Sequence, residues 1–330
     1  MAFSDYGSIS PRTGVMATAQ LLKRAENQIV LPRVMQNHPM PKNKSDTMKF
    51  RRYSAFAAAT TPLTEGVKPS GKTISKTDYT AQLNQYGDYV EITDKIADMH
   101  EDPILKEMMA VCGEQAGETI EKIAFGVATG GTNVFYANGA ARVDVNTAIS
   151  VNKLRAVVRA LRANGAKPIA EMLAASPNYK TEAVGEAFFA FCHTDLESDI
   201  RSLTGFTPVE QYGQSAKAVP FEIGKVENIR FVLSRHFASL PNAGGLKGSM
   251  VSTGGTSADV YQIVVLGKDA MGSVALKGSE SVHPMVLNPN TPRGGDPLGQ
   301  LGSVGWKTWY TAVRLNEAWM ARIEVAVTAL

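Results

Sequence analysis

The sequence predicts an α+β fold built on one very long helix and one projecting β-hairpin. Apolar residues keep helical spacing for about 27 residues after Asp102-Pro103, which at 1.5 Å per residue is a rod of roughly 40 Å. Residues 50–93 are rich in Thr, Tyr and Val, with polar and apolar side chains alternating as in strands. Short apolar runs typical of strands follow in the rest of the chain, so we expect helices and strands to be mixed there.

The first strand of the predicted hairpin begins at Phe50, and its turn lies between Thr60 and Gly71. Residues 74–94, ISKTDYTAQLNQYGDYVEITD, form the expected second strand. A lone two-stranded hairpin is marginally stable in water. We therefore expect it to lie on another molecule.

The long helix has clear start and stop signals. Asp102 is suited to cap its amino end and Pro103 to occupy its first position. An apolar face then runs from Ile104 to Val127, and Gly130-Gly131 ends the helix.

The remaining chain reads as shorter elements, and the first 50 residues read as an irregular arm with one helical piece, Ala17 to Ile29. The expected elements are a helix at 147–164, a strand at 187–193, a short helix at 196–203, strands at 228–234 and 261–267, a Gly/Ser-rich surface loop at 241–259, and two strands in 304–327 around Leu315-Asn316-Glu317.

Composition describes an ordinary folded protein with a polar arm. The chain has 330 residues, of which 44% are hydrophobic, and a net charge of +3. Residues 1–52 hold nine Lys and Arg against three acids, a net charge of +6. This arm could be solvated, contact another subunit or meet an acidic partner, and a ring that binds DNA through the arm is one alternative.

The sequence has two cysteines, Cys112 and Cys192, which lie among apolar neighbours and predict buried free thiols rather than a disulfide framework. The amino end lacks the apolar core of a signal peptide, and no apolar run approaches the roughly 18 residues of a membrane span. We expect a soluble chain with no membrane partner.

One stretch imitates a phosphate-binding loop. Residues 64–73, TEGVKPSGKT, place Gly66, Gly71, Lys72 and Thr73 in the G-x-x-x-x-G-K-[ST] spacing. A nucleotide hydrolase is therefore the alternative function. Such a loop needs a buried strand before it and a helix after it, whereas Pro62 precedes this one and strand-forming residues follow. A simple turn explains the stretch better.

No other pattern predicts catalysis or a bound group. The five histidines are scattered and none has metal-ligand spacing. His193 and Asp195 are adjacent without a nucleophile motif, which favours a structural role. We predict no enzyme activity, no metal and no cofactor.

The predicted parts make a poor monomer. An arm and a hairpin bury little surface unless neighbouring copies supply it. The sequence therefore predicts a closed homo-oligomer with large interlocking interfaces.

Local sequence adds a family resemblance. LTEGVKPSGKTIS and LNQYGDYVEITD in the hairpin, HTDLESDIRSL (193–203), IGKVENIRFVLS (223–234) and DPLGQLGSVGWKTWYTAVRLNEAWMARIEV (296–325) resemble major capsid proteins of tailed bacteriophages with the Hong Kong 97 type fold. These segments are most similar to the major capsid family of the N-four-type short-tailed phages. The resemblance spans roughly residues 60–327, whereas the arm matches only loosely.

The resemblance implies a capsid protein that assembles with itself into the hexamers and pentamers of an icosahedral head enclosing double-stranded DNA. It implies a scaffolding protein and a portal as further partners, and non-specific contact with the DNA. A decoration protein is a further partner that it leaves open. It places the chain in the virion, and in the host cytoplasm during assembly.

The resemblance also implies how the chain is divided and which groups meet between subunits. Its parts are an N-terminal arm (1–49), an extended loop (50–93), a spine helix with the first part of a peripheral domain (94–150), peripheral and axial segments (151–240), and an axial loop with the C-terminal strands (241–330). From charge and geometry, the candidate intersubunit groups are Arg51, Arg52, Glu65, Lys68 and Lys72 of the hairpin with Glu107, Glu114 and Glu118 of the long helix.

Overall fold

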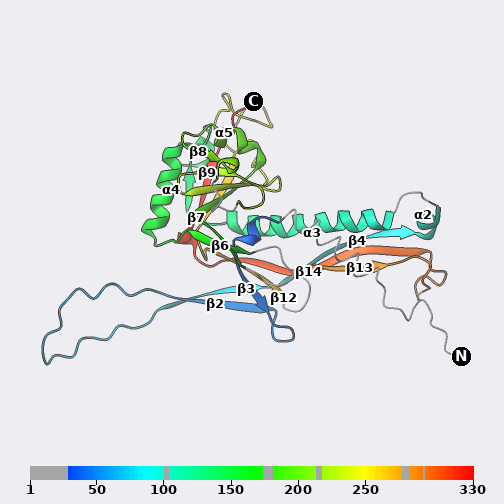
Figure 1. The fold of residues 1–330 in the computed structure, drawn as a ribbon, viewed down its shortest axis with the longest axis horizontal. Helices are drawn as coiled ribbons and strands as arrows, with labels where there is room; N and C mark the ends of the chain where they lie inside the picture. The colour runs from blue at the N-terminus through cyan, green and yellow to red at the C-terminus, as the bar shows by residue number, and fades with distance from the viewer. Residues whose placement is uncertain (1–28, 100–103, 174–180, 213–217, 277–281, 293) are drawn as a thin grey trace.

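The computed structural model of the chain describes residues 29–99, 104–173, 181–212, 218–276, 282–292 and 294–330. These residues form three parts (Figure 1). We call them the base, which is a long helix on a sheet; the lobe, which is a larger sheet with two short helices; and the hairpin, which projects from the base. The mixed helices and strands confirm the predicted α+β class.

The base contains a five-stranded sheet in which β14 is central. One edge of β14 pairs with β4 over the whole length of β4. The other edge of β14 pairs with β12 and β13, and β1 lies beyond β12. The strands are β1 (Gln36–Met40), β4 (Asn84–Thr93), β12 (Met271–Leu276), β13 (His283–Leu287) and β14 (Leu301–Arg314).

The predicted long helix is α3 (Ile104–Thr129), and it lies along one face of the base sheet (Figure 1). Its expected apolar face is buried, and Ile120 packs in one core with Trp306 of β14. The indole Nε1 of Trp306 donates to Oε1 of Gln115 at 3.0 Å, which fixes which face of β14 meets the helix. The short helix α2 (Asp94–Met99) precedes α3, and the expected cap Asp102-Pro103 lies outside the described residues.

The lobe contains an eight-stranded sheet in the order β5-β15-β11-β7-β10-β9-β8, with β6 paired to β7. Its other elements are two helices and four short 3-10 turns. The elements are β5 (Val134–Tyr136), η2 (Arg142–Asp144), α4 (Val151–Ala163), β6 (Ile169–Leu173), β7 (Thr181–Cys192), η3 (Thr194–Leu196), α5 (Glu197–Arg201), β8 (Phe206–Pro208), η4 (Val209–Gln211), β9 (Glu222–Val226), β10 (Ile229–Leu233), β11 (Tyr261–Leu266), η5 (Glu317–Trp319) and β15 (Met320–Val325).

The elements predicted in the lobe are confirmed, but β7 begins at Thr181 instead of 187 and α4 begins at Val151 instead of 147. Ser150 caps α4 by accepting from the amide of Lys153, and Leu154 and Leu161 on the helix pack against Phe188 of the sheet. The Gly/Ser-rich stretch 241–259 has no helix or strand of its own. The two C-terminal strands flank Leu315-Asn316-Glu317 as expected.

The prediction for the second hairpin strand was half wrong. The hairpin consists of β2 (Thr47–Tyr53) and β3 (Lys76–Gln82), and β4 leaves it to pair with β14. Leu83 marks the change, because its side chain is buried and its amide donates to the carbonyl of Asp46 at 2.8 Å. Alternation of side chains detects strands, but it does not reveal which strand each one pairs with.

The prediction of an irregular arm was wrong for residues 30–49. This stretch contains η1 (Leu31–Arg33), β1 and the start of β2, and Met35 and Met40 are buried. The residues that it packs against or pairs with lie on α3 and β12. The short segment itself has too little apolar periodicity to predict its structure. The expected helix at 17–29 falls outside the described residues except for Ile29, which is not helical.

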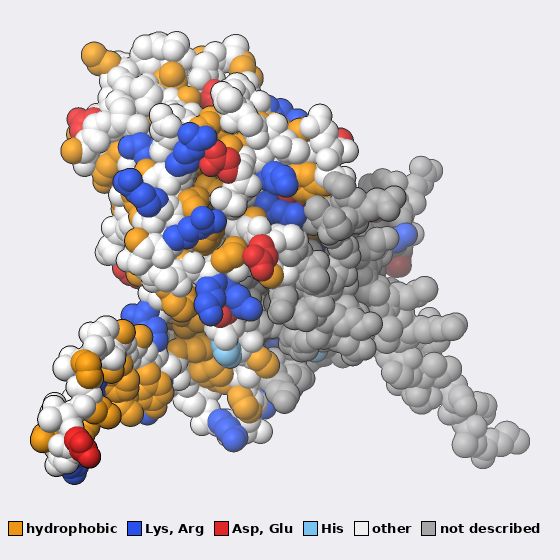
Figure 2. All heavy atoms as spheres, turned by 60° about the vertical axis from the view of Figure 1, so that its left-hand side comes forward, with side chains coloured by type: hydrophobic (Ala, Val, Ile, Leu, Met, Phe, Trp, Pro, Cys, Tyr) orange, Lys and Arg blue, Asp and Glu red, His pale blue; other side chains and the backbone are white. Residues whose placement is uncertain are grey.

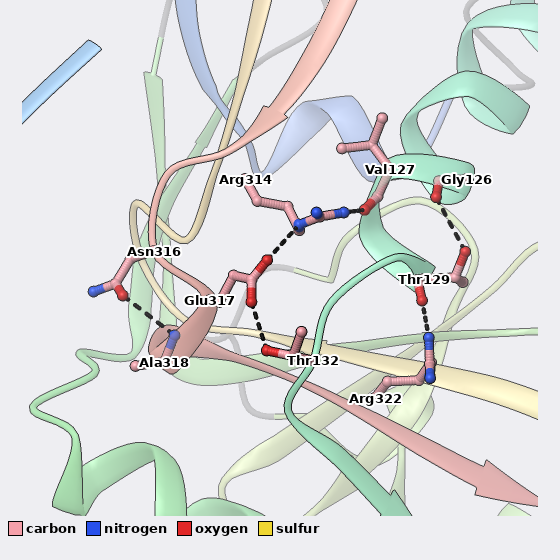
Figure 3. Close-up of polar contacts among 9 residues, drawn as sticks. All are labelled: Gly126, Val127, Thr129, Thr132, Arg314, Asn316, Glu317, Ala318 and Arg322. Carbon is pink, nitrogen blue, oxygen red and sulfur yellow. Dashed lines mark hydrogen bonds and ion pairs between the residues drawn. The ribbon is translucent and has the colours of Figure 1, made fainter. Parts of the chain in front are cut away.

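The carboxyl end of α3 is tied to the C-terminal strands (Figure 3). Arg314 donates from Nη1 to the carbonyl of Val127 at 2.8 Å and from Nε to Oε1 of Glu317 at 2.9 Å. Thr132 donates to the other oxygen of Glu317 at 2.6 Å, and Arg322 donates to the carbonyl of Thr129. Cations thereby satisfy carbonyls that the last turn of a helix leaves without partners.

Candidate assembly surface

The hairpin tip, which we define as residues 54–75, is exposed at every position. It and the adjoining strand end carry large apolar side chains in water, with exposed fractions of 78% at Leu63 and 63% at Val67. The others are Tyr53, Phe56 and Ile74. Hydrophobic side chains accordingly gather on the projecting hairpin in Figure 2. Exposed apolar surface of this kind marks a site of interaction.

Residues 54–75 form no helix or strand, but they make contacts with one another. At the start of the tip, the amide of Ser54 donates to the carbonyl of Ser75 at 3.0 Å. Gly66 has a φ of +78° in a turn closed by a bond from Val67 to Thr64. Lys72 donates to the carbonyl of Ala57 at 2.9 Å, which holds the two sides of the tip together.

This geometry contradicts the phosphate-loop alternative. No strand leads into Gly66, and no helix begins at Lys72-Thr73, because residues 54–75 contain neither. A phosphate cradle uses the amides at a helix amino end. The ammonium of Lys72 instead lies 5.9 Å from the ring centre of Phe56.

The two predicted arginines of the hairpin contact residues of their own subunit. Arg51 donates to Asp78 from Nε at 2.9 Å and from Nη2 at 3.2 Å, across the β2–β3 pair. These hydrogen bonds lower the pKa of Asp78. Arg52 lies over the ring of Tyr79 at 5.8 Å. Contact of either arginine with a second subunit stays a prediction.

The other predicted groups are divided between two distant places. Glu65 and Lys68 lie on the exposed tip, whereas Glu107, Glu114 and Glu118 lie on α3. The hairpin extends away from α3 (Figure 1), so these two sets could meet only between copies.

Glu118 already has partners within the subunit. Its Oε1 lies 2.6 Å from Nζ of Lys122 and 3.5 Å from Nδ1 of His236. Hydrogen bonding to Lys122 lowers the pKa of Glu118, although some burial opposes the change. The side chain thus joins α3 to the lobe, and a contact with another subunit stays a prediction for this residue too.

A second surface with exposed apolar side chains lies on the base sheet, on the face opposite α3, which also carries Lys307 and Glu91. Tyr89 and Met285 stand on either side of Gly305 in the strand register, and both are exposed. Trp309 and Leu301 lie on the same face, because they are an even number of residues from Gly305. A Cβ at Gly305 would come within 2.7 Å of the Cβ of Tyr89, so glycine lets Tyr89 lie close over β14.

The sequence prediction named charged groups and missed both apolar surfaces. Alternation in β14 contained part of the signal, because Trp306 and Trp309 must point to opposite faces of a strand. The sequence could not show that only one of these faces would be covered.

Other candidate chemistry has a structural explanation. Cys112 and Cys192 are free and buried, and burial raises the pKa of both thiols. His193 accepts from the amide of Asp195 at 3.1 Å, and Tyr261 donates to Asp195, which together organise a turn. Within the described part of the chain, no cluster of three or more His, Cys, Asp or Glu could hold a metal, and no helix could cross a membrane.

A long helix on an open sheet, a projecting hairpin with an apolar tip and a second uncovered apolar face define a structural protein that assembles with further copies. The sequence model of the family described as phage capsid protein matches residues 77–323. The chain belongs to this family and is a major capsid protein that forms an icosahedral shell. Its place is the capsid of the virion.

Solved capsids have the same fold. The capsid protein of Ralstonia phage GP4 aligns with a TM-score of 0.69 and 11% identity over 100% of this chain and 98% of that chain. The head structure of Helicobacter pylori bacteriophage KHP40 aligns with a TM-score of 0.62 and 10% identity over 99% of this chain and 95% of that chain. The capsid protein of cyanophage Pam1 aligns with a TM-score of 0.62 and 14% identity over 100% of this chain and 95% of that chain. The sequence matches no curated protein.

Proposed function

We propose that the chain assembles into hexamers and pentamers whose hairpins each lie on a neighbouring copy, and that the resulting shell encloses double-stranded DNA. The observation that carries this proposal is the hairpin tip. It exposes Phe56, Leu63, Val67 and Ile74, whose exposed fractions are between 54% and 78%. A second copy would remove this apolar surface from water, and the uncovered face of the base sheet offers apolar surface to receive it.

We further propose that the chain is of the N-four podophage type and follows the division given above. In this division the arm is residues 1–49 and includes β1 of the base sheet, the extended loop is 50–93 and includes β4 of that sheet, and the spine helix lies in 94–150. A scaffolding protein and a portal direct assembly in the host cytoplasm, and a decoration protein binds the finished shell. The role is structural, without catalysis.

Negative-stain electron microscopy of the chain expressed alone tests the assembly directly. We expect closed shells, or rings of five and six, in the soluble fraction. A chain that stays monomeric at every protein and salt concentration would contradict self-assembly. Trypsin provides a second readout, because cleavage after Lys72 should be fast in free subunits and strongly slowed in shells.

A pair of matched variants assigns the effect to the apolar tip. Leu63→Asp with Val67→Asp should abolish shells and rings while leaving the subunit folded, because both side chains are exposed in the described subunit. Leu63→Met with Val67→Ile keeps the apolar character and should assemble normally. Normal assembly of the Asp pair would show that the tip is not an interface.

A further inference from the structure

Glu121 is a wholly buried carboxylate in the middle of α3, with an exposed fraction of 0%. Its oxygens accept from the amides of Val30 and Leu31, at 3.0 Å to Oε2 and 3.0 Å to Oε1. These amides begin η1, and Val30, which precedes the turn, supplies no side-chain cap. Glu121 therefore caps η1 from another element of the fold.

The segment that Glu121 holds is the point where the N-terminal part of the chain joins the base. We call residues 29–35 the root. Leu31 and Met35 of the root are buried in the core that contains Ile120 and Phe125 of α3. Two kinds of contact therefore hold the root on α3: the apolar packing of Leu31 and Met35, and the hydrogen bonds from the amides of the root to Glu121.

Among the residues that the structure describes, few charged or titratable groups face this carboxylate. Arg33 of η1 is near enough to attract it, and its Nε donates to the carbonyl of Ile29 at 2.8 Å. Tyr310 of β14 faces it with a buried hydroxyl that has no hydrogen-bond partner within the described chain. On α3 itself, the nearest acid, Glu118, is engaged with Lys122 and His236.

Burial raises the pKa of Glu121 from 4.5 to about 7, although the two amides and the charge of Arg33 oppose the change. Loss of hydration is the larger effect because a buried carboxylate has only these few groups in place of water. The charge of this side chain therefore changes close to neutral pH.

We propose that Glu121 is a proton-linked latch that sets how firmly the root is docked on α3. With a proton, the carboxyl group still accepts an amide through its carbonyl oxygen and buries no charge. Without the proton, the same packing must bury a carboxylate. The docked root is then loosened, and the junction between the N-terminal segment and the base becomes a hinge.

The direction of the pH dependence follows from the two pKa values. In the undocked state the carboxyl group reaches water and titrates near 4.5, whereas in the docked state it titrates near 7. The docked state binds more protons between these values, so docking weakens as pH rises through this window. The full change in the docking equilibrium is roughly 300-fold. It concerns a single subunit, so it does not depend on how copies assemble.

Trypsin cleavage of the full-length chain, kept as free subunits, tests the latch. Cleavage between Arg33 and Val34 reports opening of the root, and cleavage after the exposed Lys72 is an internal reference that cancels the pH dependence of trypsin. We expect the ratio of the two rates to rise about tenfold from pH 6 to pH 8.5. In Glu121→Gln the ratio should be constant, and in the control Glu107→Gln it should rise as in the unmodified chain.

A constant ratio in the unmodified chain, or an undiminished rise in Glu121→Gln, would overturn the proposal. A second measurement needs no variant, in case Glu121→Gln does not fold. Carboxyl carbon shifts of the unmodified chain should show the Glu121 titration with a midpoint near pH 7. A midpoint close to the ordinary value of about 4.3 would also overturn it.

Discussion

Arg142 and Glu324, 182 residues apart in sequence, form a two-point ion pair within the lobe. Nε of Arg142 donates to Oε2 at 2.7 Å and Nη2 donates to Oε1 at 2.6 Å. Glu324 on β15 is wholly buried, whereas Arg142 on η2 reaches the surface. The hydrogen bonds to Glu324 raise the pKa of the guanidinium, so Arg142 keeps its charge and ties η2 to the sheet.

Replacing one residue of this pair should lower the free energy of unfolding more than replacing both. Arg142→Met leaves Glu324 buried with Arg322 as its remaining ion-pair partner among the described residues, and we expect a loss of about 2–4 kcal/mol in the free energy of unfolding. The double variant with Glu324→Met should recover most of it. Urea unfolding measures each variant, and equal losses in the single and double variants would contradict this account.

The carboxyl end of α3 should depend on the forked shape of Arg314. Arg314→Lys keeps the charge but cannot bond both Val127 and Glu317 in the same geometry, so we expect a loss of about 1–2 kcal/mol. Hydrogen exchange should accelerate in the last turn of α3. Arg159→Lys on the exposed face of α4 is the matched control and should leave exchange there unchanged.

Asp259 organises the loop 241–258 and should make its order dependent on acid. The carboxylate accepts from the amide of Asn242 at 2.8 Å and from the amide and hydroxyl of Thr253 at 3.0 and 2.6 Å. The pKa of Asp259 is lowered below 3.8, because these bonds outweigh the opposing effect of burial. Its contribution to stability is present above pH 3.8 and is lost as pH falls through the lower folded value.

Melting temperatures at several pH values check this prediction. The unmodified chain should melt well above Asp259→Asn at pH 6, and the difference should shrink as pH falls below about 4. Glu210→Gln, an exposed change on η4, should show no such convergence. A difference that stays constant down to pH 2.5 would mean that the carboxylate charge is not what holds the loop.

Lys72 should have no part in nucleotide binding. Its ammonium holds the tip by bonding the carbonyl of Ala57, and no helix begins within residues 54–75. We expect neither the unmodified chain nor Lys72→Ala to bind a fluorescent ATP analogue. Saturable binding that Lys72→Ala abolishes would restore the hydrolase alternative.

The elements that the sequence predicted well are those whose signals are local. The extents of α3 and α4 follow from apolar side chains three and four residues apart and from the glycines that end them. The pairing of β4 with β14 joins Asn84 to Tyr310, and no local pattern contains that information. The same limit explains β1, whose partner β12 lies more than 200 residues away.

The candidate surface shows a similar limit. Charge indicated that Arg51 and Glu118 could meet a partner, but each is engaged by a residue of its own subunit, Asp78 and Lys122. The latch at Glu121 was invisible in sequence, because a glutamate in a helix is ordinary until its depth is known. Depth depends on the whole fold.

The continuity of β3 and β4, with Leu83 alone between them, has a mechanical consequence. The two strands run on in nearly one direction (Figure 1), so a pull on the hairpin tip is delivered along β4. The antiparallel ladder with β14 lies across that pull and is loaded in shear, where its backbone bonds share the force instead of opening one after another. Tension arriving from a neighbour is therefore carried into the centre of the base sheet by the main chain itself.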